Sequence, residues 1–146
     1  MNYYLSVLKN YANFNGRARR SEYWFFVLFN VIFSIAALIV DYLLGTRYDF
    51  EQAYGESYIS IHLGYINIIY GLLMFIPGLA VSVRRLHDLG KSGWFILICL
   101  IPLIGPIWLL VLFFTDSKVG VNQYGPNPKG IGNHDEIDEI GSDLHK

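Results

Sequence analysis

The chain has 146 residues, of which 53% are hydrophobic and only 16% are charged. An average soluble domain has roughly 25% charged residues, and a disordered chain combines low hydrophobicity with high net charge. The formal charge of -1 disfavours a basic nucleic-acid binder, so no nucleic-acid partner is expected. The single cysteine, Cys99, excludes an internal disulfide and a cysteine-based zinc site. The composition indicates a membrane protein of one domain.

The first residues form an amphipathic pattern. Apolar positions such as Tyr4 and Leu8 recur with helical period, and Lys9 lies on the opposite face. A turn signal follows at residues 13–16. The pattern predicts a short interfacial helix that lies in the headgroup plane.

Three apolar runs follow, at residues 23–44, 58–83 and 94–114. Each is long enough to cross a bilayer core, which takes about 20 helical residues. The first contains one charged residue, Asp41, near its far end, and the other two contain none. A helix of a soluble bundle would show a polar face about every 3.6 residues, which these runs lack. The expected fold is therefore all-α and integral to the membrane, with three transmembrane helices.

The third run is interrupted by Pro102 and Pro106, and a proline inside a helix removes hydrogen bonds and kinks the axis. One kinked span would carry residues from Thr115 onward to the outer side. A re-entrant hairpin would instead return them to the cytoplasm. Its arms would have only about ten residues each, too short to cross separately, so we favour the kinked full span.

Cationic residues are concentrated at two places. They are Lys9, Arg17, Arg19 and Arg20 before the first run, and Arg84, Arg85 and Lys91 between the second and third. Two spans separate these groups, so both lie on one side, which the positive-inside rule assigns to the cytoplasm. The loop at residues 45–57 is acidic, as expected of the outer side. The sequence predicts a multi-pass protein of the bacterial inner membrane with a cytoplasmic N-terminus.

Small and polar residues form one stripe on each of the first two runs. They are Asn30, Ser34 and Asp41 on the first run, and Gly64, Asn67, Gly71 and Gly78 on the second. Small residues let helices approach closely, and Asn can hydrogen-bond between them, which favours a packing seam. The alternative is a polar pathway for an ion or a small solute.

Three sequence blocks carry a family resemblance. They read F-x-G-R-x-R-R-S-E-Y-W at 14–24, R-R-L-H-D-x-G-x-S-G-W at 84–94, and N-x-Y-G-P-x-P at 122–128. Together they resemble the domain-of-unknown-function 805 family of small bacterial inner-membrane proteins. The resemblance implies a compact multi-span protein with a cytoplasmic N-terminus, and it implies no activity. The chain departs from typical members in its longer outer loop (45–57) and in an acidic extension after Lys129.

The basic blocks supply the candidate site. The candidates for an anionic ligand or lipid headgroup are Arg17, Arg19, Arg20, Arg84, Arg85, His87, Asp88 and Lys91. In the structural alternative, Arg84 or Arg85 pairs with Asp88 or Glu22 and braces the two blocks against each other. His87 and Asp88 are adjacent on a helix and make a poor catalytic dyad. No phosphate loop, zinc signature or nucleophile elbow is present, so no catalytic residue, metal or cofactor is assigned.

The expected organisation is a single membrane domain at residues 1–128 and a disordered acidic tail at 129–146. Within the domain, residues 122–128 are expected to fold back with Tyr124 as an interfacial anchor. We expect a non-catalytic membrane module that contacts lipids, including anionic headgroups, or binds a partner. Such a partner is either a second copy of this chain in a homo-oligomer or another membrane protein. The second hypothesis is a small transporter or channel subunit that uses the polar stripe, and the third is a membrane-embedded enzyme acting on a phosphorylated lipid.

Overall fold

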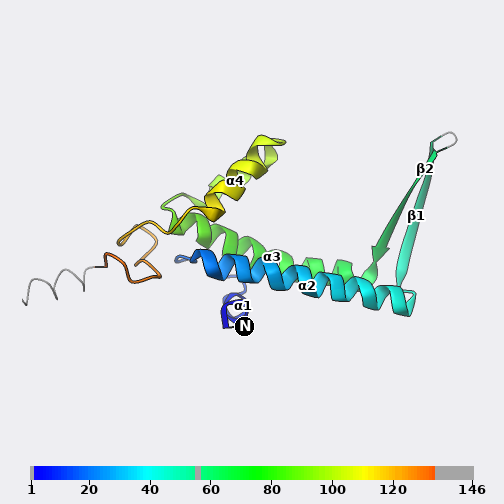
Figure 1. Ribbon diagram of the computed structural model, residues 1–146, viewed down its shortest axis with the longest axis horizontal. Coiled ribbons are helices and arrows are strands. Elements are labelled where there is room, and N and C mark those ends of the chain that lie inside the picture. The colour runs from blue at the N-terminus through cyan, green and yellow to red at the C-terminus, as the bar shows by residue number, and fades with distance from the viewer. Residues whose placement is uncertain (1, 55–56, 134–146) are drawn as a thin grey trace, which may run out of the picture. The chain divides into compact units, whose positions relative to one another are not determined.

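A computed structural model of the protein describes residues 2–54 and 57–133 (Figure 1). The predicted acidic tail lies outside the described residues from position 134 onward. The elements in chain order are α1 (Asn2–Lys9), α2 (Arg20–Leu44), β1 (Arg47–Tyr54), β2 (Ser57–Gly64), α3 (Tyr65–Asp88), the 3-10 helix η1 (Gly93–Leu100) and α4 (Ile104–Phe114). The chain divides into two compact units, of which unit 2 comprises Val27–Ile76 and unit 1 comprises the remainder. Helices α2 and α3 contribute to both units.

Helix α1 confirms the predicted N-terminal helix. Val7 and Tyr4 are buried, whereas Leu5 is exposed. The Tyr4 ring stacks on Phe26 of α2 with 5.8 Å between ring centroids, so α1 is held by aromatic contacts. The predicted turn follows, with Gly16 at a φ of 83° that favours glycine.

Helices α2 and α3 are long and apolar enough to cross a membrane. They have 25 and 24 residues, and their most apolar windows have mean hydropathies of 2.3 and 2.0. Only 6% and 17% of the residues in those windows are buried within the protein, so their apolar side chains face outward. The predicted span at residues 23–44 therefore coincides with α2. Two helices rather than three meet this description in the described chain, so the predicted count of three spans is not confirmed.

The second apolar run begins as a strand and not as a helix. Strands β1 and β2 form an antiparallel hairpin in which Arg47 faces Gly64, and α3 begins only at Tyr65. The reason is the sequence at residues 59–64, where apolar and polar or small residues alternate with the period of two that favours a strand. The remaining apolar stretch of α3, residues 65–83, has a helical length of about 28 Å, which matches a bilayer core of roughly 30 Å.

The third apolar run reverses direction and does not form one kinked helix. Its first part is η1 and its second part is the short helix α4, which pack against each other (Figure 1). Leu103 between them has a φ of 66°, a backbone conformation that a leucine rarely adopts outside a tight reversal. A side chain at Gly105 would overlap the carbonyl oxygen of Ile98, so only glycine permits this approach. One kinked helix over residues 94–114 is therefore not formed, and the described segment is a hairpin of two short helices. We call it the apolar hairpin (residues 93–114).

Both ends of the apolar hairpin lie at the C-terminal end of α3. At its start, Gly93 lies against Val83 and His87 of α3. At its end, the Trp24 ring stacks on Phe114 with 4.3 Å between centroids, and Trp24 Nε1 donates to the Phe113 carbonyl. The hairpin therefore leaves and returns to one end of unit 1.

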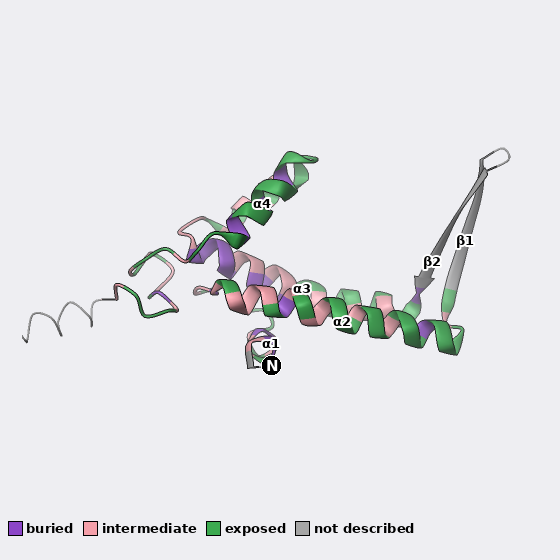
Figure 2. Cartoon of the chain, viewed as in Figure 1, coloured by how far each residue is buried: buried purple, intermediate pink, exposed green. Residues whose placement is uncertain are grey.

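The core of unit 1 is concentrated at that same end (Figure 2). Leu86 of α3 packs with Leu109, Leu112 and Phe113 of α4. Ala18 and Ala80 are fully buried, and the Ala18 amide donates to the carbonyl of Arg84 at 3.0 Å, which ties the start of α2 to the end of α3. This close packing positions the charged residues of both basic blocks.

Candidate functional site

Asp88 at the end of α3 is fully buried between two arginines. Its Oδ1 accepts a hydrogen bond from Arg17 Nε at 2.9 Å, and its Oδ2 accepts from Arg85 Nη1. The side chains of all three residues are at most 1% exposed. We call these three residues the Asp88 cluster. Because a buried charge is costly unless it is paired, each member depends on the others.

Arg17 also holds the chain that follows α4. Its guanidinium donates to the backbone carbonyls of Lys118 at 2.6 Å, Gly120 at 2.7 Å and Gly125 at 3.3 Å. It also donates to the carbonyl of Asp88 at 3.3 Å. A planar guanidinium has five N–H donors and can bond several carbonyl oxygens at once, whereas the ammonium group of lysine lacks this geometry.

Arg85 and Arg84 are neighbours in sequence with different partners. Arg85 Nη2 donates to the carbonyl of Thr115, just after α4. Arg84 Nη1 pairs with Glu22 Oε1 of α2 at 2.9 Å. The Nε and Nη2 atoms of Arg84 are buried and make no hydrogen bond among the described residues. Both predicted pairs are therefore present, and the Arg84–Glu22 pair joins the two blocks, whereas Arg85 and Asp88 lie in the same helix.

His87 lies beside this cluster and carries the returning C-terminal segment. Its Nδ1 is 3.2 Å from the carbonyl oxygen of Gly16, so Nδ1 is the donor. The ring of Tyr124 stacks on the His87 ring with 3.7 Å between centroids and an angle of 3° between planes. The Asn122 side chain donates to the His87 carbonyl at 2.9 Å. The predicted fold-back of residues 122–128 is therefore present, with Tyr124 docked on a histidine.

A further ion pair lies at the surface of the same C-terminal segment. Lys129 Nζ donates to the carboxylate of Asp116, which lies just beyond α4. This hydrogen bond, together with one from the Ser117 backbone amide, lowers the pKa of Asp116 below its usual value. The contact is exposed, so its contribution to stability is small.

The other cationic candidates lie outside the Asp88 cluster. The Arg19 guanidinium is 5.4 Å from the ring centroid of Tyr3, and Arg20 donates to the carbonyl of Phe114. Lys91 Nζ lies 5.0 Å from the ring centroid of Phe95. These contacts leave their charges without a carboxylate ion pair in the described part of the chain, whereas Arg17, Arg84 and Arg85 each form one, with Asp88 shared by two of them.

In unit 2, Asp41 caps helix α3. Its Oδ1 accepts from Thr46 Oγ1 at 2.7 Å and from the Ile66 amide at 3.0 Å, and its Oδ2 accepts from the Asn67 amide at 2.9 Å. A carboxylate at a helix N-terminus satisfies free N–H groups and complements the helix dipole. A side chain at Gly64 would overlap this carboxylate, so the glycine leaves room for the cap.

The remaining stripe residues bond to each other between α2 and α3. Asn67 Nδ2 donates to the Ser34 carbonyl and to Ser34 Oγ, both at 2.9 Å, and Tyr70 Oη donates to Asn30 Oδ1 at 2.6 Å. A cavity of about 380 Å³ lies beside these residues and Gly71. Gly78 belongs to unit 1 and faces Phe26. The polar groups of the stripe are used in helix packing.

The carboxylate of Asp88 is engaged by two arginines, and no metal-binding cluster forms among the described residues. The described residues contain no group of three or more His, Cys, Asp or Glu side chains that could hold a metal. Asp88 is bonded to both arginines, so neither of its oxygens is free to act as a base towards a substrate. The sequence analysis missed that Arg17 donates to backbone carbonyls more than 100 positions away, because a backbone carbonyl leaves no mark in the residue types.

These features define a small helical protein with two span-length apolar helices, an apolar hairpin and a buried polar cluster at one end. The chain belongs to the family described as protein of unknown function (DUF805), which matches residues 11–126. This confirms the resemblance carried by the three sequence blocks.

Its relatives are named as inner membrane proteins. The chain is 45% identical over 131 residues to the inner membrane protein YhaH of Escherichia coli strain K12, covering 88% of this chain and 98% of that one. It is 42% identical over 129 residues to the inner membrane protein YhaI of the same strain, covering 88% and 97%. No solved structure matches the chain.

Proposed function

We propose that the protein is a non-catalytic, lipid-contacting module of the bacterial inner membrane. In this proposal α2 and α3 cross the membrane. The apolar hairpin enters the cytoplasmic leaflet and returns, and both the N-terminus and the segment after α4 lie in the cytoplasm. The observation that carries the proposal is that the hairpin exposes its apolar side chains while both its ends lie at the C-terminal end of α3, the second bonded to Arg85 and the first against His87.

The exposed surface of the hairpin supports contact with lipid. At the tip, Leu100 and Leu103 are 75% and 81% exposed, and Ile104 and Trp108 on α4 are also exposed. Contiguous apolar patches of this kind are uncommon on soluble monomers and mark contact with a membrane or a partner. The arms have 8 and 11 residues, too few to cross a bilayer but enough to enter one leaflet. The names of the relatives support the inner membrane as the location.

Charge distribution supports the cytoplasmic side. Arg17, Arg84 and Arg85 gather at one end of unit 1, and Arg19, Arg20 and Lys91 belong to the same unit. Positive residues near span ends are enriched on the cytoplasmic side and attract anionic lipids there. A hairpin that returns to this end also brings Lys118 and Lys129 to the cytoplasm, which a full third span would not do.

The bonding of the polar stripe disfavours a transport subunit. A transported ion needs a ligand whose hydrogen bonds are free to exchange, and the Asp41 carboxylate already accepts three hydrogen bonds as a helix cap. Asn67 and Ser34 bond to each other. No specific observation favours the third hypothesis, a membrane-embedded enzyme acting on a phosphorylated lipid.

Quenching of tryptophan fluorescence by brominated acyl chains tests lipid contact directly. A variant that keeps only Trp108 (Trp24→Phe and Trp94→Phe) is reconstituted in vesicles with and without brominated lipid. We expect strong quenching of Trp108, because its side chain is exposed on α4 within the leaflet. The matched control keeps only Trp24, which packs on Phe114, and we expect weaker quenching. Equal or weaker quenching of Trp108 would show that protein, not lipid, covers the hairpin.

A further inference from the structure

A second feature of unit 1 is an apolar cavity between α3 and the start of η1. Its volume is about 510 Å³, within the range of roughly 300–1,000 Å³ that is typical of small-molecule sites. Its walls come from the N-terminal loop, α3, η1 and the returning segment, and the lining residues used below are Leu79, Val83, His87, Ser92, Leu97 and Tyr124.

The cavity is apolar at one end and polar at the other. Leu79, Val83 and His87 follow each other at four-residue intervals on one face of α3 and span about 12 Å along its axis. Leu79 and Val83 belong to the apolar part of the helix, and His87 belongs to its polar end. The apolar wall of the cavity therefore suits the acyl chain of a phospholipid. The polar group at the end of that wall suits the headgroup.

The polar end contains an unused hydrogen-bond acceptor. His87 is 92% buried, since only 8% of it is exposed, and its Nδ1 donates to the Gly16 carbonyl. In the neutral ring Nε2 is therefore an acceptor. Nε2 makes no hydrogen bond within the described chain, and it faces Gly93 of the cavity wall, where an added Cβ would lie 3.4 Å away. No described residue occupies this acceptor, so a donor from a ligand in the cavity fits this position.

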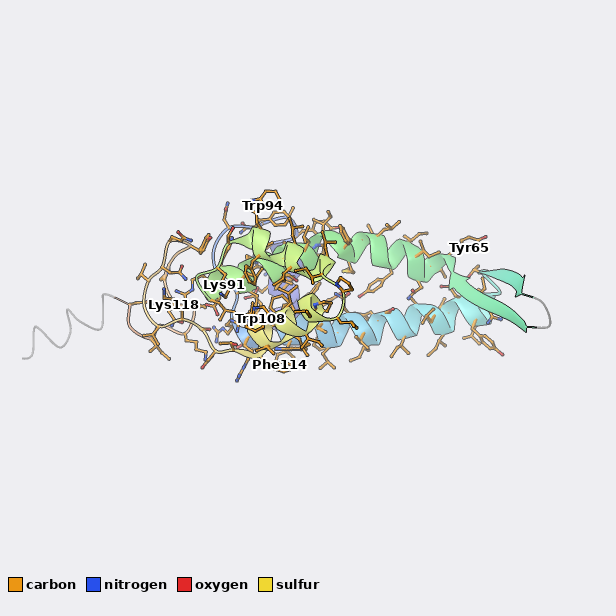
Figure 3. All side chains as sticks on the ribbon, turned by 90° about the horizontal axis from the view of Figure 1, so that it is seen from above. Tyr65, Lys91, Trp94, Trp108, Phe114 and Lys118 are labelled. Carbon is orange, nitrogen blue, oxygen red and sulfur yellow. The ribbon has the colours of Figure 1, made fainter. Side chains whose placement is uncertain are left out.

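The rim of the cavity has the composition of a membrane interface. Trp94 is 80% exposed and projects outward from the start of η1 (Figure 3). Tryptophan is enriched at the level of lipid headgroups. Lys91 lies next to the rim residue Ser92 and makes no ion pair with a described carboxylate, so its ammonium group is available to a phosphate.

From this geometry we infer that the cavity binds one phospholipid of the cytoplasmic leaflet whose headgroup carries an N–H donor. One acyl chain lies along Leu79, Val83 and Leu97, and the headgroup donates to His87 Nε2, with Lys91 near the phosphate. The inference rests on the proposed membrane location and specifies a single binding site beyond general lipid contact.

Native mass spectrometry tests the inference on the full chain released from vesicles. The vesicles contain equal amounts of palmitoyl-oleoyl phosphatidylethanolamine, which has N–H donors, and the matching phosphatidylcholine, which has none. We expect wild type to retain one lipid and to prefer phosphatidylethanolamine at least fivefold. His87→Asn keeps a donor near Nδ1 but removes Nε2, and it should abolish the preference.

Filling the cavity provides the second arm of the test. Leu97→Trp should reduce the lipid-bound fraction at least fivefold, whereas Leu100→Trp on the same helix does not line the cavity and should leave it unchanged. Elution of every variant as one species in detergent shows that the fold is intact. The inference is overturned if wild type is stripped of lipid, if Leu97→Trp retains lipid as wild type does, or if both headgroups bind equally. Absence of wild type from the membrane fraction of cells would instead overturn the proposed function.

Discussion

Neutralising Asp88 is expected to be the most damaging conservative change in unit 1. In Asp88→Asn the amide is nearly isosteric with the carboxylate, so packing is preserved while the charge is lost. The carboxylate serves Arg17 with one oxygen and Arg85 with the other. Whichever way the amide turns, its NH₂ group faces a guanidinium N–H, and two buried cations remain without a counter-ion.

Removing one partner of a buried ion pair costs about 3–5 kcal/mol, which corresponds to roughly two to four decades in the unfolding equilibrium constant. The assay is thermal unfolding of the detergent-solubilised protein together with its abundance in membranes. Glu22→Gln is the matched control, because Glu22 is partly exposed and pairs only with Arg84 among the described residues. The stability lost in this variant should be clearly smaller than in Asp88→Asn. A loss of less than about 1 kcal/mol for Asp88→Asn would refute the assignment of the cluster as the structural centre of unit 1.

Three further substitutions test separate contacts. Arg17→Lys keeps the charge but loses the guanidinium fork, so hydrogen exchange of residues 118–125 should accelerate at least tenfold; unchanged exchange would contradict the role of Arg17 in holding them. Asp41→Asn should lower the unfolding temperature by less than Asp88→Asn does, because the partners of Asp41 are neutral donors and no buried cation loses its counter-ion. Reconstituted wild type should show no ion flux that the variant removes. Gly105→Ala should destabilise the apolar hairpin by about 1–3 kcal/mol, whereas Gly71→Ala, whose site is open, should be nearly neutral in the same unfolding assay.

Much of the helical fold could be predicted from hydrophobicity alone. Long uncharged runs determine α2 and most of α3, because burial of apolar side chains in lipid does not depend on distant partners. The start of α3 was misplaced because residues 58–63 are apolar on average, and their alternation is a weaker signal than their hydropathy. The cap supplied by Asp41 fixes where the helix begins, and a contact across 25 positions is not visible in a local pattern.

The structure of the third apolar run was harder to predict, because its length suggests one continuous span although the chain reverses within it. Twenty-one consecutive residues without charge suit a full span, and the sequence does not show that Gly105 is placed to let α4 pack on η1. The residue types of the candidate site were predictable, and so were the alternative pairs of Arg84 and Arg85. The partners of Arg17 were not, because they are backbone carbonyls that carry no sequence signature.

The side of the membrane that residue 121 faces tests the re-entrant arrangement most directly. Single cysteines at Asn15→Cys, Gln52→Cys and Val121→Cys, each with Cys99→Ala, are treated with a membrane-impermeant maleimide before and after the inner membrane is opened. The re-entrant hairpin predicts that Gln52→Cys is labelled from outside, whereas Asn15→Cys and Val121→Cys are labelled only after opening. Labelling of Val121→Cys from outside, together with Gln52→Cys, would establish a full third span and contradict the hairpin.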